Sequence, residues 1–146
     1  MRTRKTGIFL RAVAAILLLL AVYCAGVPAV ADEMLAKPTG PVILTVTGAI
    51  GRTNAPGKAE FDRQMLEALG ISRLATSTSW TDGKPVFAGV LASKLLDAVQ
   101  AKGNTVSAIA LDGYTVEIPI SELRQYPVIF ALTMNDKAMS PQDKGP

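Results

Sequence analysis

The chain has 146 residues, of which 15 are lysine or arginine and 12 are aspartate or glutamate. It contains one cysteine, Cys24, and no histidine. These two residue types supply most ligands for soft and borderline metals and many catalytic bases and nucleophiles. Their scarcity therefore excludes most metalloenzyme classes and the hydrolases that depend on cysteine or histidine.

Residues 1–31 have the pattern of a secretory signal peptide. Basic residues open the segment, an apolar run follows at residues 12–22, and Ala29-Val30-Ala31 provides the small residues that signal peptidase requires. We expect cleavage between Ala31 and Asp32, a periplasmic mature protein, and no stable membrane insertion after cleavage. The apolar run is about 11 residues long, whereas a membrane-spanning helix needs roughly 20. An uncleaved membrane anchor is the alternative.

The signal segment also accounts for the basic charge of the chain. It contains four of the 15 basic residues and none of the 12 acidic ones, so residues 32–146 carry 11 basic groups against 12 acidic groups. No basic cluster remains that could neutralise a phosphate backbone, and nucleic-acid binding is not expected. These about 115 residues suffice for one domain with one core, without a disulfide framework.

In chain order, the first predicted element of the mature chain is a flexible leader at residues 32–41. Residues 41–48 then form a strand, whose nearly continuous apolar sequence is typical of a strand covered on both faces. Apolar residues at helical spacing predict a helix over residues 60–69, ended by Gly70. A strand rich in hydroxyl side chains is predicted over residues 71–79.

The clearest helix of the second half is predicted over residues 89–102, with Gly103 capping its C-terminal end. Asp112-Gly113 is a turn signal between two short strands and predicts a β-hairpin. Ser121 is placed to cap a short helix that ends near Gln125. The strands predicted in this half are residues 105–111, 114–118 and 128–134.

This order of elements mixes local hairpins with crossover helices. It favours an α+β domain with a mixed β-sheet and two to three short helices over a doubly wound fold. We expect residues 42–146 to form this single domain.

A cluster of polar side chains before a tryptophan is the most distinctive local feature. A loop of this kind could donate several hydrogen bonds to an oxyanion or polar ligand, with the indole as an apolar wall. Alternatively, the hydroxyls bond neighbouring backbone groups at the end of a strand. The residues of the cluster are Thr76, Ser77, Thr78, Ser79 and Trp80.

The carboxylates predict no catalytic or metal-binding set. Asp112 precedes a glycine, which is a turn preference. Asp62 lies on or near the predicted helix over residues 60–69, where a solvated face accounts for it. Met134 and Met139 are expected to pack in the core.

Three segments resemble the oxidoreductase molybdopterin-binding domain, the catalytic-domain fold of sulfite oxidase. More closely, they resemble small exported bacterial proteins that carry a reduced version of it. The segments are residues 80–91 with 95–97, residues 110–119 and residues 139–146, and the likeness covers most of residues 42–146. Because such domains continue past a Lys-Gly-Pro segment into another strand, the resemblance implies either a chain truncated at Pro146 or a missing strand.

The resemblance implies a molybdenum-ligating cysteine in the loop that precedes Trp80. The matching residues 75–79 contain none. We therefore expect no cofactor, and molybdopterin is not supported by the residues. Serine ligates molybdenum in other molybdoenzymes, which leaves Ser77 or Ser79 as the alternative ligand.

These considerations predict an exported, non-catalytic domain that acts as a ligand-binding or protein-interaction module. Its expected site joins the loop of residues 76–80 to Asp112, Tyr114 and Lys144, with Lys144 supplying positive charge for a small anionic ligand. An inner-membrane sensor protein is the expected protein partner. Two alternatives stay open: a residual molybdopterin-dependent oxidoreductase without the cysteine ligand, and a structural subunit of a periplasmic complex that adds a strand at an open sheet edge.

Overall fold

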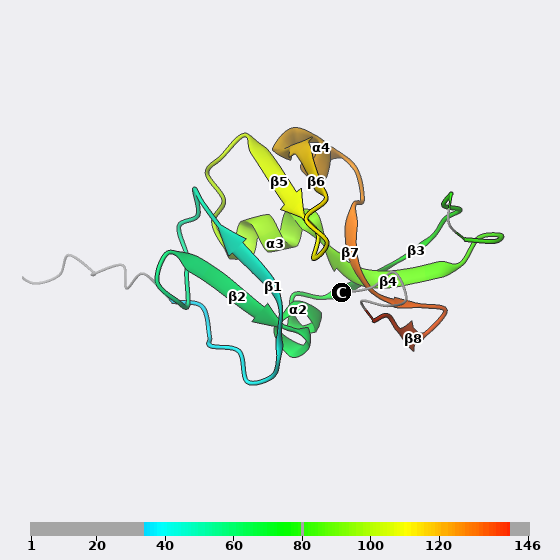
Figure 1. Ribbon diagram of the computed structural model, residues 1–146, viewed down its shortest axis with the longest axis horizontal. Coiled ribbons are helices and arrows are strands. Elements are labelled where there is room, and N and C mark those ends of the chain that lie inside the picture. Colours follow the sequence, from blue (N-terminus) through cyan, green and yellow to red (C-terminus); the bar gives the residue numbers. More distant parts are fainter. Residues whose placement is uncertain (1–33, 80, 141–146) are drawn as a thin grey trace, which may run out of the picture. The chain divides into compact units, whose positions relative to one another are not determined.

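The computed structural model of the protein describes residues 34–79 and 81–140. In this part of the chain, strands alternate with short helices (Figure 1), and the expected α+β class is confirmed. The strands are β1 (Val42–Thr47), β2 (Lys58–Asp62), β3 (Ile71–Ala75), β4 (Val86–Leu91), β5 (Thr105–Ile109), β6 (Thr115–Pro119), β7 (Ile129–Met134) and β8 (Lys137–Ala138). The helices are α2 (Arg63–Ala68), α3 (Ala92–Ala98) and α4 (Ile120–Gln125).

The strands lie in three sheets with the orders β1-β2, β3-β4-β7-β8 and β5-β6. Each pair that the described strands form is antiparallel. Strand β4 is paired on both sides, because Val90 lies opposite Ile71 of β3 and opposite Phe130 of β7. Within the described residues, no helix has the length and apolar character needed to cross a membrane.

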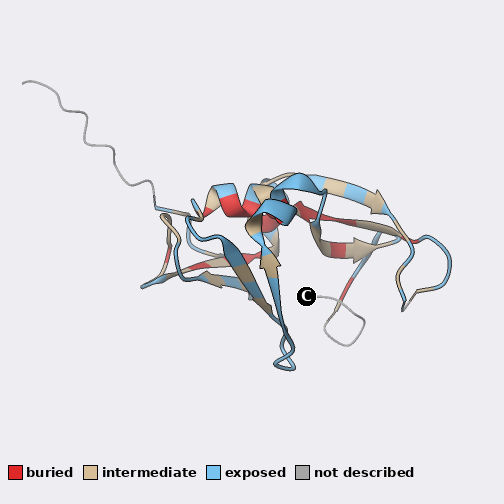
Figure 2. Ribbon diagram, turned by 90° about the horizontal axis from the view of Figure 1, so that it is seen from above, coloured by how far each residue is buried: buried red, intermediate tan, exposed pale blue. Residues whose placement is uncertain are grey.

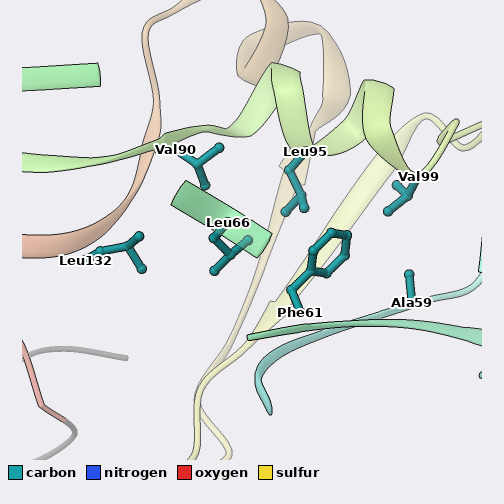
Figure 3. Close-up of a cluster of buried hydrophobic side chains, with 7 residues drawn as sticks. All are labelled: Ala59, Phe61, Leu66, Val90, Leu95, Val99 and Leu132. Carbon is teal, nitrogen blue, oxygen red and sulfur yellow. The ribbon is translucent and has the colours of Figure 1, made fainter. Parts of the chain in front are cut away.

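Two hydrophobic clusters connect these sheets. Figure 3 shows the larger one, which consists of Ala59, Phe61, Leu66, Val90, Leu95, Val99 and Leu132. The smaller cluster consists of Ala92, Leu96 and Leu123, from α3 and α4. Val106 of β5 and Ile118 of β6 pack against it. The base of the β5–β6 hairpin is therefore attached to the domain through α3 and α4.

The helix predicted over residues 60–69 is wrong in its first turn. Residues up to Asp62 belong to β2, and Phe61 lies opposite Leu44 of β1. In β2 the side chains of Ala59 and Phe61 are buried, while those of Lys58 and Glu60 are only half-buried, which is the alternation of a strand. Because Phe61 continues the apolar spacing of α2, the sequence pattern placed the start of the helix too early.

The helix predicted over residues 89–102 is also too long at both ends. Its first residues extend β4 as far as Leu91, because β3 and β7 pair with them from either side. At its C-terminal end Gln100, not Gly103, takes the left-handed conformation, with φ of 51°. Ala101 N–H donates to the Leu96 carbonyl at 2.9 Å, which is the closing bond of a Schellman motif.

Two predicted strands differ in length or environment from the observed ones. β3 ends at Ala75, the last residue that pairs with β4, so residues 76–79 form a loop and not a strand. β1 is not covered on both faces: Val42, Thr45 and Thr47 are exposed, and the strand pairs only with β2 among the described residues.

The C-terminal elements follow their turn signals closely. The hairpin around Asp112-Gly113 and the strand at residues 128–134 are confirmed as β5–β6 and β7. Ser121 does not cap α4, because the helix already begins at Ile120 and Pro119 takes the N-cap position without a side-chain bond. After β7, Asn135 and Asp136 both have positive φ, as a two-residue hairpin turn of type I′ requires, and they lead into β8.

Candidate functional site

The loop between β3 and β4 carries the hydroxyl cluster identified in the sequence. The last pair of the two strands is Ala75 with Val86, and the Thr76 N–H donates to the Pro85 carbonyl at 3.2 Å just beyond it. Residues 76–79 are therefore presented at the end of a paired strand, at the far end of β3 and β4 in Figure 1.

Threonine side chains in this loop bond the loop itself. Thr78 Oγ1 and Thr81 Oγ1 lie 2.8 Å apart, and Thr81 Oγ1 also accepts from the Thr78 N–H at 3.3 Å. Thr76 Oγ1 donates to the Ser77 carbonyl at 3.4 Å. These bonds hold the loop together, which is the structural role that the sequence offered as the alternative to ligand binding. Ser77 and Ser79, in contrast, are exposed at the loop surface.

The second predicted part of the site is the tip of the β5–β6 hairpin. Asp112 Oδ1 accepts from the Tyr114 N–H at 3.0 Å, so the Asp112 carboxylate stabilises the turn in the manner of an Asx-turn. The Tyr114 side chain is 69% exposed. Both residues are thus on the surface of a projecting hairpin.

These two parts of the predicted site lie apart in both views of the domain (Figures 1 and 2). The β3–β4 loop extends from one end of the β4 strand, while the hairpin tip points away from α3 and α4. Trp80 and Lys144, which complete the predicted site, fall outside the described residues, as do the signal segment and the cleavage position between Ala31 and Asp32. Ligand binding at either loop stays a prediction.

Asp62 is a buried polar residue that the sequence reasoning placed on a solvated face. Its Oδ2 accepts from the backbone N–H groups of Thr39 at 2.8 Å and Gly40 at 2.9 Å, and its Oδ1 accepts from the Met65 N–H at 2.8 Å. The bond from Met65, followed by that from Gly40, lowers the pKa of the carboxyl below its ordinary value. Asp62 is therefore the N-cap of α2 and also holds the segment before β1. The signal that could have identified it is an aspartate directly before a helical apolar pattern.

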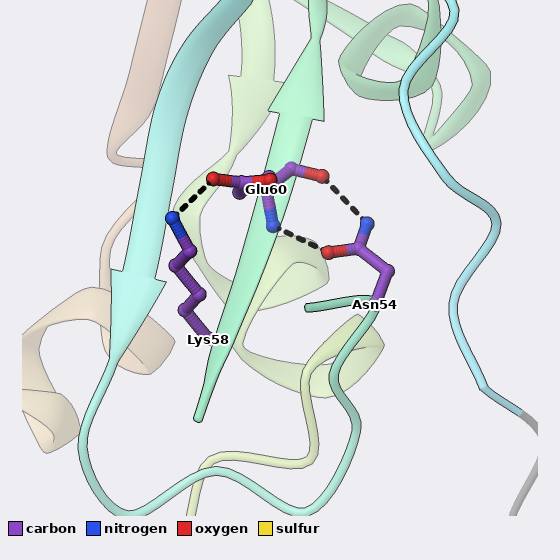
Figure 4. A network of polar contacts seen from close by, with 3 residues as sticks. All are labelled: Asn54, Lys58 and Glu60. Atoms are coloured by element: carbon purple, nitrogen blue, oxygen red, sulfur yellow. Dashed lines mark hydrogen bonds and ion pairs between the residues drawn. The ribbon is translucent and has the colours of Figure 1, made fainter. Parts of the chain in front are cut away.

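Asn54 is the other buried polar residue of the described chain. Figure 4 shows its amide against Glu60: Oδ1 accepts from the Glu60 N–H and Nδ2 donates to the Glu60 carbonyl, each at 2.8 Å. Nδ2 also donates to the Ala36 carbonyl at 2.7 Å. The amide thus extends the pairing of this edge of β2 beyond the backbone bridge between Ala55 and Lys58, which is a structural role.

Three arginines that could in principle bind an anionic cofactor are engaged elsewhere. Arg73 pairs with Asp136 at 2.6 Å, and Arg124 pairs with Asp97 at 2.8 Å. Arg63 donates to the Leu132 carbonyl at 3.3 Å. Within the described residues, no cluster of three or more histidine, cysteine, aspartate or glutamate side chains could hold a metal ion.

The fold and the loop define an α+β domain whose potential site presents hydroxyl groups. The sequence model of the oxidoreductase molybdopterin binding domain matches residues 59–146, which is more than half of the chain. The protein belongs to this family, as its resemblance indicated. No curated protein matches the chain.

The residues present do not fit the cysteine-ligated molybdenum that the family resemblance implies. Residues 32–146 contain neither cysteine nor histidine, and the loop in question offers hydroxyl oxygens in place of a thiolate. A thiolate is a soft, anionic ligand, whereas an alcohol is neutral at physiological pH. Two of the loop hydroxyls, those of Thr78 and Thr81, already bond each other.

Proposed function

We propose that this protein is an exported, non-catalytic member of the molybdopterin-binding domain family that acts as a ligand-binding or protein-interaction module. The proposal rests on the side chains of the β3–β4 loop. Residues 76–79 of this loop carry only hydroxyl side chains, at the position where the family resemblance places the ligating cysteine. A scaffold that keeps its strands and core but lacks that ligand retains surfaces for recognition.

Metal and pterin analysis tests this proposal directly. The protein is isolated from the periplasm of a host that makes molybdopterin, and its molybdenum content is measured together with pterin fluorescence after oxidation. We expect neither molybdenum nor pterin at a stoichiometric level. Stoichiometric amounts of both would establish the alternative, a residual oxidoreductase.

A gain-of-ligand variant provides the matched comparison. Ser77→Cys introduces a thiol at an exposed position of the loop, where no core packing is disturbed. If the natural chain lacks the cofactor because it lacks the thiolate, this variant is expected to retain more molybdenum than the natural chain under the same expression conditions. An equal molybdenum content in both proteins would mean that the cysteine is not the deciding difference.

The module proposal also predicts a measurable ligand or partner effect. A small anionic ligand that binds the folded protein raises its melting temperature in proportion to the logarithm of ligand concentration above Kd. Molybdate, sulfate and phosphate are suitable first probes because each presents acceptor oxygens to hydroxyl donors. A protein partner, for example a sensor in the inner membrane, would instead be retained on the folded chain without any of these ions.

A further inference from the structure

The tip of the β5–β6 hairpin exposes three large apolar side chains. Ile109 is 71% exposed, Leu111 90% and Tyr114 69%. Only its base is covered, where Val106 and Ile118 pack on the cluster of α3 and α4. Figure 2 shows the tip projecting beyond the buried part of the domain. A two-stranded hairpin has little stability of its own in water, so a partner strand would stabilise this projecting part.

The backbone groups along the outer edge of β5 can be assigned from the hairpin register. Ile120 N–H donates to the Asn104 carbonyl, and Ala110 N–H donates to the Tyr114 carbonyl. The backbone groups of Asn104 and Ala110, which flank β5, therefore face the β6 side of the hairpin. In an antiparallel ladder the direction alternates at every residue. The N–H and C=O groups of Thr105, Ser107 and Ile109 therefore point away from β6. No backbone hydrogen bond from another described segment reaches them.

The two edges of this hairpin have opposite chemistry. On β6, the backbone groups of Glu117 and Pro119 point away from β5. Glu117 carries a charge and Pro119 has no N–H, and both features oppose pairing with a further strand. The outer edge of β5 has neither. Residues 104–111 contain no charged residue, no proline and no glycine, and Thr105, Ser107 and Ile109 are all exposed. One edge is blocked and the other is open.

We propose that the outer edge of β5 is a self-association site, at which β5 pairs antiparallel with β5 of a second copy of this chain. A two-fold axis at Ser107 places Ser107 opposite its copy and Ile109 opposite Thr105 of the copy. All these positions carry outward backbone groups, so each pair exchanges both of its N–H···O bonds. The uncharged edge makes this symmetric register free of like-charge contacts, and Ile109 becomes covered.

The same symmetry disfavours two other strand edges, those of β6 and β3. Pairing β6 with its copy about its middle residue would place Glu117 opposite Glu117, and pairing β3 with its copy would place Arg73 opposite Arg73. Like charges directly opposite each other destabilise a strand pair. A second copy therefore fits β5 better than either of these strands. The inference goes beyond the proposed function, since it holds whether or not the β3–β4 loop binds a ligand.

Sedimentation velocity of the isolated protein over a concentration series tests the proposal. We expect a monomer–dimer equilibrium for the natural chain. Ser107→Lys places two like charges at the two-fold axis and should raise the dimer dissociation constant by at least ~tenfold. Ser107→Pro removes an outward N–H without touching the hairpin ladder and should do the same. Glu117→Pro makes the same change on the same rung but on the blocked edge, and should leave the dissociation constant unchanged.

A single-cysteine experiment locates the axis. Paired Cα atoms that exchange hydrogen bonds lie about 5.5 Å apart, which a disulfide can bridge. In a Cys24→Ser background, Ser107→Cys should form a covalent dimer on mild oxidation, whereas Thr105→Cys should not, because it faces Ile109 of the copy. A chain that stays monomeric at all concentrations overturns the proposal. So does a dimer that Ser107→Lys leaves intact, or that Glu117→Pro weakens equally. Molybdenum content has no bearing on either readout.

Discussion

Gly89 lies where β4 and β7 approach most closely, and its replacement by alanine is the sharpest test of the fold. The register between these strands shifts at Gly89: Ala88 lies opposite Thr133 and Gly89 opposite Ala131. No residue of β4 therefore lies opposite Leu132, whose side chain is buried in the core. A Cβ on Gly89 would overlap the Phe130 carbonyl oxygen and lie 2.7 Å from Ala131 Cα. Glycine is required here by the close approach of another backbone.

The cost follows from what must move. Carbon atoms pack at about 3.5–4.0 Å, so a contact at 2.7 Å requires a displacement of roughly 1 Å. Inserting atoms into a packed interior costs about 1–3 kcal/mol. The obstructing atoms belong to backbone and not to a flexible side chain, so we expect Gly89→Ala to lower the free energy of unfolding by about 3 kcal/mol, the upper end of that range. In a domain of this size, the melting temperature should fall by on the order of 10 °C.

Gly103→Ala is the matched control. Its added Cβ would meet nothing closer than the Thr105 carbonyl oxygen at 3.8 Å, and Gly103 does not have positive φ. Alanine at such a position stabilises by about 0.4–1 kcal/mol through the unfolded chain. Urea unfolding of both variants, followed by circular dichroism, gives the two changes under one set of conditions. Equal stability of Gly89→Ala and Gly103→Ala would refute the strand register that places Leu132 in the core.

Two other substitutions probe groups that the sequence pattern did not identify. The lowered pKa of Asp62 means that its carboxylate stabilises the fold above the ordinary aspartate pKa and that this contribution is lost as pH falls below about 4. Thermal unfolding across this range should show a weaker acid dependence for Asp62→Asn than for the natural chain; parallel curves would contradict the capping role. Gln100 has left-handed φ of 51°, which is unfavourable for a side chain other than asparagine or glycine. Gln100→Gly should therefore raise the free energy of unfolding by about 0.5–1 kcal/mol in urea titrations, and a decrease would show that the Gln100 side chain contributes more than the backbone strain costs.

Turns were predictable from the sequence because their signals are local. Asp112-Gly113 needs only its own backbone preferences to reverse the chain, and the turn forms where expected, between β5 and β6. The helix starts were not predictable in this way. Phe61 and Leu91 each continue the helical spacing of the residues that follow them, but strand partners from distant parts of the sequence hold both extended. Pairing with β1, β3 and β7 thus decided between two patterns that were locally equivalent.

The candidate site shows the same division. The sequence singled out the hydroxyl cluster but placed it in a strand, whereas residues 76–79 form the loop between β3 and β4. It left open whether the hydroxyls serve a ligand or the neighbouring backbone. The bonds of Thr78 and Thr81 to each other are a property of the folded turn. Asp62 was assigned to a solvated face because its buried contacts come from Thr39 and Gly40, which lie more than twenty residues away.

The described surfaces favour protein interaction over small-ligand binding as the form that the proposed module takes. A ligand that uses the threonine hydroxyls of the β3–β4 loop must compete with the Thr78–Thr81 bond, and exchanging one hydrogen bond for another yields about 1 kcal/mol or less. The β5–β6 hairpin offers Leu111 at 90% exposed and Ile109 at 71% exposed, together with unpaired backbone groups on the same strand edge. Burial of apolar area contributes about 25 cal/mol per Å², a gain that no loop hydroxyl can match. More free energy of association is therefore available at the hairpin than at the loop. A dimer that Ser107→Lys leaves intact would remove this preference.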